Sequence, residues 1–335
     1  MAEIISGKTF KYTSKPYVLS YASVGGKMEK EGPYGDLFDI TYGDSLFGEK
    51  SFEKAESKLQ KTALMCAVKK ATVNKNQIDC IFGGDLLNQC IGTSFGMRDM
   101  GLPFVGVYGA CSTMALSLML AGISVDCGMA KTAAAVTSSH FCSAERQYRY
   151  PLNYGNQRTQ TAQRTVTAAG AVILSNSENQ IYLHSATAGR ICDLGVTDAN
   201  NMGAAMAPAA ADTIYRYFSD TFTTPNEYDA IFTGDLGHVG TLLLYELLEE
   251  KGIDIKGKHK DCGLLIYNRE TQDVHSGGSG CGCAAGVLCS YILNKMSAGH
   301  YKNILFCATG ALLSPTSSFQ GESIPGVAHL VNIRA

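Results

Sequence analysis

The sequence lacks the features that mark nucleic-acid-binding, membrane-spanning and disulfide-rich proteins. Its 335 residues carry 28 Lys and Arg against 30 Asp and Glu, so we expect no basic surface and no nucleic acid partner. No apolar run approaches the ~20 residues of a membrane span, and the first residues lack the apolar segment of a signal peptide. Twelve cysteines are too few for a disulfide scaffold. We therefore expect a soluble chain in a reducing compartment, which would meet a membrane through partner proteins.

Short apolar runs alternate with helical patterns along the chain, and 45% hydrophobic residues are ample for a core. This alternation is typical of βα units around mostly parallel sheets. The predicted strands are residues 17–24, 78–83, 103–108, 131–138, 168–175, 181–189, 230–233, 264–267, 303–309 and 327–333. The predicted helices cover residues 51–71, 204–218 and 239–250, and further helices begin near residues 86 and 112 and after residue 280. An α/β protein follows from this pattern.

The second half of the chain repeats the first. The segment IDCIFGGDLLNQ resembles YDAIFTGDLGHV, and in both an Asp ends a strand and a helix follows. The segment that begins GACSTM likewise aligns with SGCGCAAG, which places Cys111 opposite Cys281. A repeat of this length indicates an internal duplication, with halves at residues 1–178 and 179–335.

Cys111 lies where a predicted strand turns directly into a helix, in YGACSTM. The free N–H groups of a first helical turn favour an anion, so this position modestly favours thiolate. A good nucleophile would also need a positioned base. The alternative is that Cys111 is a small residue that fills a tight corner.

Asp85 and Asp235 occupy equivalent places in the two repeats, each after a predicted strand. Open α/β sheets bind ligands at the carboxyl ends of their strands, which favours a binding role for both side chains. Asp also caps the helix that follows it, and this second reading stays open.

Residues 138–170 combine cationic and aromatic side chains. They are Arg146, Arg149, Arg158 and Arg164 with Phe141, Tyr148, Tyr150 and Tyr154. Arginine binds carboxylates through two parallel hydrogen bonds and tyrosine stacks on flat rings, so this segment predicts a lid over a small planar anion. A solvated loop or a dimer contact would have the same composition. His140 could contact a ligand or be a satisfied loop histidine.

The duplicated halves with a strand, GACS and a helix resemble the thiolase fold, including its ketoacyl-carrier-protein synthase III branch. The resemblance implies duplicated βαβαβαββ halves in a five-layered αβαβα arrangement, and an acylated Cys at position 111. In those condensing enzymes a His and a later Asn or His activate the Cys thiol and bind the thioester oxygen. Here Asp235 stands near the first place, with His238 a turn later, and Gly278 and Ser279 occupy the second. Condensation chemistry is therefore not expected.

A narrower resemblance covers essentially the whole chain. It rests on EKEGPYGDLFD, GGDLLNQ, YGACST, TSSH, AERQYRYP, TDANNMGAAMAPAAADTI, TGDLG, HKDCGLLIY, GGSGCGC and ATGALLSPTSSFQGESIPGVAH. These strings resemble the stage V sporulation protein AD family of spore-forming bacteria. The resemblance implies binding of dipicolinic acid (pyridine-2,6-dicarboxylate). It also implies work with the other stage V A membrane proteins at the spore inner membrane, in dipicolinate uptake during sporulation and release in germination.

Dipicolinate is flat, aromatic and doubly anionic, which suits an Arg and Tyr lid over a thiol pocket. We expect Cys111 with nearby backbone N–H groups to receive one carboxylate and Arg146 or Arg149 to receive the other. The further expected ligand-binding residues are Asp85, Asn88, His140, Asp235 and Ser279. A calcium ion that travels with the ligand would meet Asp85 or Asp235. Otherwise we expect no cofactor and no resident metal, and the thiolase resemblance implies a homodimer.

Two rival functions remain at this point. The first is a residual acyltransferase or thioesterase that uses Cys111 with His140 or His238. The second is a structural subunit that docks on membrane partners and whose pocket is a relic. Acylation of Cys111 would favour the enzyme, binding without acylation would favour the carrier, and neither would favour the scaffold.

Overall fold

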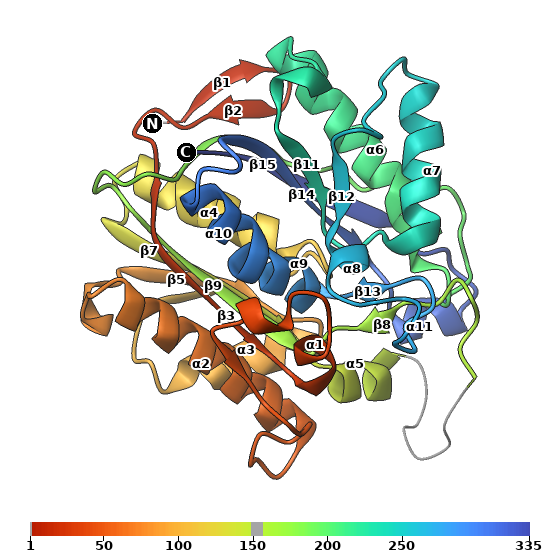
Figure 1. Cartoon of the computed structure of the whole chain (residues 1–335), viewed down its shortest axis with the longest axis horizontal. Helices are drawn as coiled ribbons and strands as arrows, with labels where there is room; N and C mark the ends of the chain where they lie inside the picture. The colour runs from red at the N-terminus through yellow and green to blue at the C-terminus, as the bar shows by residue number, and fades with distance from the viewer. Residues whose placement is uncertain (1, 149–156) are drawn as a thin grey trace.

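The computed structural model describes residues 2–148 and 157–335 (Figure 1). The strands of the first half are β1 (Glu3–Ser6), β2 (Thr9–Lys11), β3 (Tyr17–Gly25), β4 (Ile40–Thr41), β5 (Cys80–Gly84), β6 (Phe104–Gly106), β7 (Thr132–Ser139), β8 (Arg164–Thr165) and β9 (Ala168–Ser175). Those of the second half are β10 (Tyr182–Thr187), β11 (Ala230–Thr233), β12 (His259–Asp261), β13 (Gly278–Ser279), β14 (Asn303–Ala311) and β15 (Gly326–Arg334). The helices are α1 (Lys27–Lys30), α2 (Phe52–Lys70), α3 (Ile91–Arg98), α4 (Thr113–Asp126), α5 (Phe141–Tyr148), α6 (Met202–Thr221), α7 (Gly237–Glu249), α8 (Cys262–Leu265), α9 (Cys281–Val287), α10 (Leu293–Ser297) and α11 (Pro315–Phe319).

The two halves have the same strand order from the centre of the sheet to its edge. The order β3-β9-β7-β5-β6 on one side matches β10-β15-β14-β11-β12 on the other. In both halves the first two pairings are antiparallel and the last two are parallel. The halves meet where Tyr17 of β3 pairs with Tyr182 of β10. This arrangement confirms the predicted duplication of the fold.

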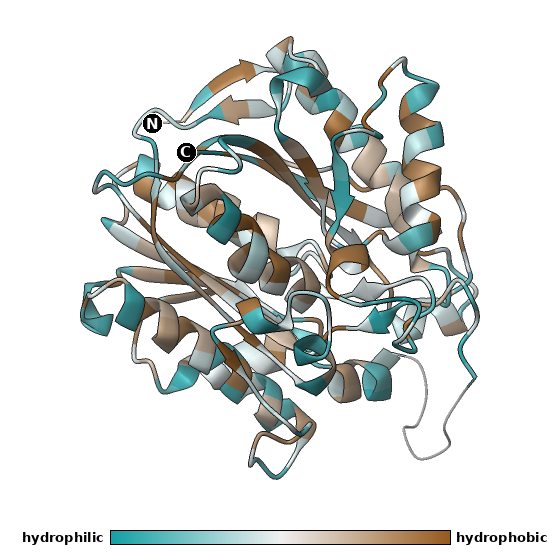
Figure 2. Cartoon of the chain, viewed as in Figure 1, coloured by the Kyte–Doolittle hydropathy of each residue, from teal (hydrophilic) through white to brown (hydrophobic). Residues whose placement is uncertain are grey.

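Helices lie on both faces of each half-sheet, in five layers. Helices α4, α9 and α10 pack between the halves, while α2 with α3 and α6 with α7 cover the outer faces (Figure 1). The sequence explains this placement, because α9 has all seven residues buried and α4 has buried residues around its whole circumference. Hydrophilic residues recur along the outer helices α2 and α6 (Figure 2).

Two predicted elements were wrong. The expected strand at residues 264–267 is helical, since α8 covers Cys262–Leu265 and the edge strand is β12 just before it. A short apolar run cannot by itself distinguish a strand from a buried helical turn, which explains the error. The helix expected from residue 86 begins at Ile91 instead, because Gln89 and Cys90 take the left-handed φ values of 56° and 51°.

Within the two described ranges, no helix is both long and apolar enough to cross a membrane.

Candidate functional site

A tight turn presents Cys111 at the start of α4. Ala110 has a left-handed φ of 48°, and the Ser112 hydroxyl donates a 2.6 Å hydrogen bond back to the carbonyl of Gly109. Gly310 on β14 packs against this turn, where an added Cβ atom would lie 2.4 Å from the Gly109 oxygen. The close approach of β14 explains why a glycine is needed there. Cys111 is thereby buried, with 4% of its surface exposed.

A small cavity opens beside the Cys111 thiol. Its lining residues are Leu86, Tyr108, Ala110, Cys111, Ala144, Tyr148, Thr165, Met202, Ser279, Ala311 and Leu313. Its volume is about 30 Å³, measured as the space that the centre of a water molecule can occupy. A second depression of about 260 Å³, the vestibule, shares Tyr108, Tyr148 and Leu313 with the cavity and adds Leu87, Asn88, Gln89, Leu312 and Ser314. The vestibule therefore adjoins the cavity at these three side chains.

Two tyrosines stand where the vestibule and the cavity meet. The hydroxyl groups of Tyr108 and Tyr148 lie 3.2 Å apart, and Tyr148 also donates a hydrogen bond to the carbonyl of Leu86. The neighbouring Gln147 accepts a 3.1 Å hydrogen bond from the backbone N–H of Asn88. The last turn of α5 is thus fastened to the segment after β5, and this contact narrows the path to Cys111.

Asp235 reaches the Cys111 thiol from the other half of the chain. Its buried carboxylate accepts hydrogen bonds from the thiol, from the Gly280 N–H at 2.8 Å and from the Thr309 hydroxyl at 2.8 Å. Burial outweighs these donors and raises the pKa of Asp235 to about 7. The thiol therefore contacts a carboxyl group that gains or loses its charge near neutral pH.

Asp261 holds the loop that carries Asp235. Its two oxygens accept hydrogen bonds from the N–H groups of Leu236 and Gly237 at 2.8 and 2.9 Å. It also accepts a 2.6 Å hydrogen bond from the hydroxyl of Thr233, the last residue of β11. Burial raises the pKa of Asp261 to about 6. Asp261 is therefore a positioning residue for Asp235.

Asp85 has a different role from Asp235, although both follow equivalent strands. It accepts hydrogen bonds from the N–H of Leu87 at 2.8 Å and from the N–H and hydroxyl of Thr93 at 2.7 and 2.6 Å. Burial raises the pKa of Asp85. Burial and the nearby charge of Asp85 together raise the pKa of Glu56 on α2. Asp85 is not among the residues that line the cavity, and its contacts match the capping alternative.

Neither predicted histidine lines the cavity. His140 is buried between Phe47 and Phe52, with its Nε2 atom 2.8 Å from the carbonyl of Ser45 and its Nδ1 atom accepting from the N–H of Cys142. Burial lowers the pKa of His140 to about 4, so the ring is neutral at pH 7. His238 is exposed on α7. This placement counts against the rival function in which one of these histidines acts as a base for the thiol.

Three arginines of the predicted lid, Arg146, Arg158 and Arg164, do not line the cavity. Arg146 pairs with Glu53 of α2, with half of its side chain exposed. Arg158 pairs with Asp273 at 2.7 Å, and the Arg164 guanidinium lies 3.8 Å from the ring centre of Phe141. Arg149 falls outside the described residues, as do Tyr150 and Tyr154. None of the described lining residues carries a positive charge.

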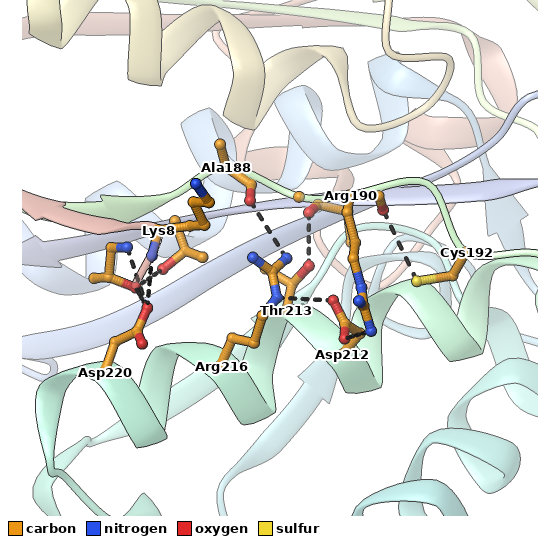
Figure 3. Close-up of polar contacts among 12 residues, drawn as sticks. Lys8, Ala188, Arg190, Cys192, Asp212, Thr213, Arg216 and Asp220 are labelled. Carbon is orange, nitrogen blue, oxygen red and sulfur yellow. Dashed lines mark hydrogen bonds and ion pairs between the residues drawn. The ribbon is translucent and has the colours of Figure 1, made fainter. Parts of the chain in front are cut away.

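Arginines gather at a second place, between α6 and the segment that follows β10, and these too are paired. Arg190 and Arg216 converge on Asp212 with N–O distances of 2.6 and 2.8 Å (Figure 3). One turn beyond, Asp220 accepts hydrogen bonds from the backbone of Lys8 and Thr9 and so fixes the β1–β2 hairpin (Figure 3). These contacts stabilise the fold and leave no clear anion site.

Of the expected ligand-binding residues, Cys111 and Ser279 line the cavity and Asn88 lines the vestibule. Sequence reasoning missed Thr309, Tyr108 and Met202. The internal repeat could have indicated Thr309. Strand β14 is the counterpart of β7, and Ser138 stands at the position of β7 that is equivalent to Thr309. Among the described residues no group of three His, Cys, Asp or Glu side chains could hold a metal ion.

Sequence comparison identifies the family. A family model for stage V sporulation protein AD matches residues 6–334. The chain belongs to this family. The stage V sporulation protein AD of Bacillus subtilis (strain 168) is 45% identical over 326 residues, which cover 97% of this chain and 96% of that protein. Family membership connects the chain to stage V of sporulation.

Solved structures of condensing enzymes share the fold of this family member. The 3-oxoacyl-[acyl-carrier-protein] synthase III of Aquifex aeolicus is 14% identical and superimposes with a TM-score of 0.58 over 96% of this chain and 100% of that one. Cerulenin-bound OleA of Xanthomonas campestris is 13% identical, with a TM-score of 0.60 over 97% and 98% of the two chains. The thiolase-like fold class is thus confirmed, and identities this low show the fold alone.

Proposed function

We propose that this member of the stage V sporulation protein AD family binds dipicolinate in the cavity beside Cys111 and does not catalyse condensation. The observation that carries the proposal is the set of groups around the thiol. A carboxyl group, Asp235, contacts the thiol where the condensing enzymes would place an imidazole, and neither His140 nor His238 reaches it. A carboxyl group with a pKa near 7 can still accept a proton. The case against condensation therefore rests on the second position, where Gly278 and Ser279 stand in place of the Asn or His of the condensing enzymes.

The shape and lining of the site suit a small flat ring. Tyr108 and Tyr148 offer aromatic faces, and the vestibule of about 260 Å³ adjoins the cavity at these two side chains. Rotation of Tyr148 away from Leu86 would join the two spaces. One ligand carboxylate would then lie at the N-terminus of α4, near the Cys111 thiol and the Ser279 hydroxyl.

The partners follow from the same family-based proposal. Dipicolinate would be passed to or from the other stage V A membrane proteins, with this chain at the inner membrane of the spore. A calcium ion would accompany the ligand.

A homodimer would form along the free edge of β6, where Val105 is 41% exposed.

Acyl transfer is the second candidate, and the hydrogen bond between Cys111 and Asp235 favours it. The Cys111 sulfur would attack the carbonyl carbon of an acyl thioester while Asp235 takes the thiol proton. The bond to the leaving sulfur would break and that sulfur would take up the proton, which leaves an acyl-Cys111 thioester and a free thiol. His140 and His238 have no part in this reaction.

Calorimetric titration with dipicolinate, with and without calcium, tests the proposal. We expect saturable binding to the wild-type protein and loss of binding in Cys111→Leu, whose larger side chain would fill the cavity. Ile191→Ala is a matched control, because Ile191 is 65% exposed and lines neither space. Mass spectrometry after incubation with acetyl-CoA tests the second candidate. An acetyl adduct on Cys111 without dipicolinate binding would contradict the proposal and favour acyl transfer.

A further inference from the structure

A groove runs between helices α2 and α3, which lie side by side on the outer face of the first half-sheet (Figure 1). Residues spaced by three or four positions along α2 form one wall, and they are Lys54, Lys58, Lys61 and Met65. The facing wall on α3 consists of Ile91, Phe95 and Arg98. The volume of this α2–α3 groove is about 790 Å³, measured as the space that the centre of a water molecule can occupy. Its described lining includes none of the residues that line the cavity or the vestibule.

Close contacts between the two helices form the floor of the groove. The Ser57 hydroxyl donates a 2.8 Å hydrogen bond to the carbonyl of Gly92. Gly96 lies against the Ser57 carbonyl, because a Cβ atom added to Gly96 would be 2.8 Å from that oxygen. The helix pair is therefore one fixed surface, with the longer side chains of both helices at the rim.

Three large apolar side chains are exposed in the groove. Met65 is 40% exposed, Ile91 38% and Phe95 49%. Exposed apolar groups with polar residues around them commonly mark a contact with another protein. The wall from Lys54 to Met65 is about 17 Å long at 1.5 Å per residue, which equals about three turns of a helix. The groove thus has the length and lining of a surface that receives the apolar side of one partner helix.

The charged side chains of the groove form ion pairs at its rim. Lys58 pairs with Glu49 at an N–O distance of 3.4 Å. Lys61 and Arg98 both pair with Asp99, at 3.1 and 3.4 Å. Exposed pairs of this kind contribute little to stability, so these cations are available to the carboxylates of a partner.

Positive charge is in excess around the apolar side chains. Glu53, the remaining carboxylate of the lining, already pairs with Arg146. Lys54 is exposed, and its ammonium group forms no ion pair with the described residues. With Arg146 included, five cations therefore face three carboxylates. The groove is complementary to an apolar strip that is flanked by acidic side chains.

We propose that the α2–α3 groove binds an acidic amphipathic helix of a partner protein. The apolar side of that helix would contact Met65, Ile91 and Phe95, and its carboxylates would pair with Lys54 and the other cations of the rim. A basic helix would instead meet an excess of like charge. This inference is independent of dipicolinate binding, because the groove is separate from the site beside Cys111.

Fluorescence anisotropy with a labelled synthetic helix tests the proposal on the full chain. The probe is a peptide of Leu, Ala and Glu with its leucines on one side, and a length of about 18 residues allows it to form a helix. The comparison peptide has Lys in place of every Glu. We expect saturable binding of the acidic peptide and about tenfold weaker binding of the basic one. The affinity of the acidic peptide should fall as the salt concentration rises.

Two exposed positions of the groove separate its apolar and charged contributions. We expect Phe95→Asp to weaken binding of the acidic peptide about tenfold, since it removes an apolar contact and adds a like charge. Lys54→Glu should weaken it about threefold. Phe222→Asp and Lys302→Glu are the matched controls, because both residues are exposed and neither lines the groove. Both controls should bind the peptide as wild type does.

Three results would overturn the inference. The first is the absence of saturable binding by the acidic peptide, and the second is equal binding of the acidic and basic peptides. The third is wild-type affinity in Phe95→Asp. Light scattering of Phe95→Asp gives a further check, because a fall from the mass of two chains to that of one would assign the groove to a second copy and contradict a separate partner. None of these outcomes affects the proposed binding of dipicolinate.

Discussion

The carboxyl group of Asp235 accepts a hydrogen bond from the Cys111 thiol, although the two residues belong to opposite halves of the duplicated chain. Cys111 lies between β6 and α4, whereas Asp235 follows β11 and its loop is held by Asp261 and Gln163. The functional pair therefore forms only when the two half-sheets close around α4 and α9. In this pair a carboxyl group takes the place of the imidazole that the resemblance to condensing enzymes implies.

Replacement of Asp235 by Asn should change how stability depends on pH. The folded pKa of about 7 lies above the ordinary value of 3.8, so between these two pH values the folded protein holds a proton that the unfolded chain has lost. Asp235 therefore destabilises the fold increasingly as pH rises from 4 to 7, by up to about 4 kcal/mol. We expect the unfolding free energy of Asp235→Asn minus that of wild type to rise by a comparable amount over this range.

Urea unfolding at several pH values measures this difference. The subtraction removes the opposite contribution of the buried histidines, whose lowered pKa values make the fold less stable as pH falls below 6.5. Asp193→Asn is a suitable control, because Asp193 is exposed and its change should not add a trend of this sign. A constant difference between Asp235→Asn and wild type would show that Asp235 is ionised throughout.

Truncation of Tyr148 should expose Cys111 to reagents. Tyr148 lines both the cavity of about 30 Å³ and the vestibule, and its hydroxyl group is hydrogen-bonded to Leu86 and Tyr108. We expect Tyr148→Ala to increase the rate of Cys111 modification by an aromatic disulfide at least tenfold, with a smaller effect on a methylating thiol reagent. Mass spectrometry of the Cys111 peptide gives both rates. Tyr215→Ala, on the outer helix α6, should leave them unchanged, and equal rates in Tyr148→Ala and wild type would exclude Tyr148 as the barrier.

Removal of Arg146 should have little effect on dipicolinate binding. Its guanidinium pairs with Glu53 at the surface and does not face the cavity. An exposed pair of this kind contributes about 1 kcal/mol or less to stability. We expect Arg146→Ala to bind with an affinity within twofold of wild type by calorimetry and to unfold at nearly the same urea concentration. A tenfold loss of affinity would mean that Arg146 leaves Glu53 when the ligand binds.

A charge on the free edge of the sheet should prevent dimer formation. Strand β6 ends the described sheet, and Val105 at its centre is 41% exposed. Edge strands pair readily with a second copy, and lysine on the edge opposes such pairing. Light scattering after gel filtration should give the mass of two chains for wild type and of one chain for Val105→Lys. Leu242→Lys on α7 is a control at another exposed apolar residue, and dimers in Val105→Lys would place the interface elsewhere.

Much of the fold could be read from local patterns. The strand expected at residues 168–175 matches β9 (Ala168–Ser175), and the helix expected at 51–71 matches α2 within one residue at each end. The spacing of apolar residues in these two segments is typical of a strand and of a helix that pack against a core. The segment at 264–267 failed because its apolar residues pack against both halves of the protein as a helical turn, and nothing local distinguishes that environment from a sheet.

The candidate site, like the fold, was predicted only in part from the sequence. The turn at Cys111 and the strand end before Asp235 were predicted from the repeat, whereas the directions of His140 and Arg146 were not. Each of these two side chains has a partner from a distant segment, the carbonyl of Ser45 and the carboxylate of Glu53. Composition identified a cationic and aromatic segment, but partner choice depends on which residues the fold brings alongside it.

The sequence by itself determined the duplication, the family and the position of a thiol at a strand-to-helix turn, because these depend on order and spacing along the chain. The tertiary structure decided the chemistry of that thiol. Only closure of the two halves buries Asp235 against Cys111, removes it from water and moves its pKa to about 7, while Asp85 at the equivalent place is used to cap its own loop. Burial and long-range contact set the charge of a side chain, and neither is written in its neighbours along the sequence.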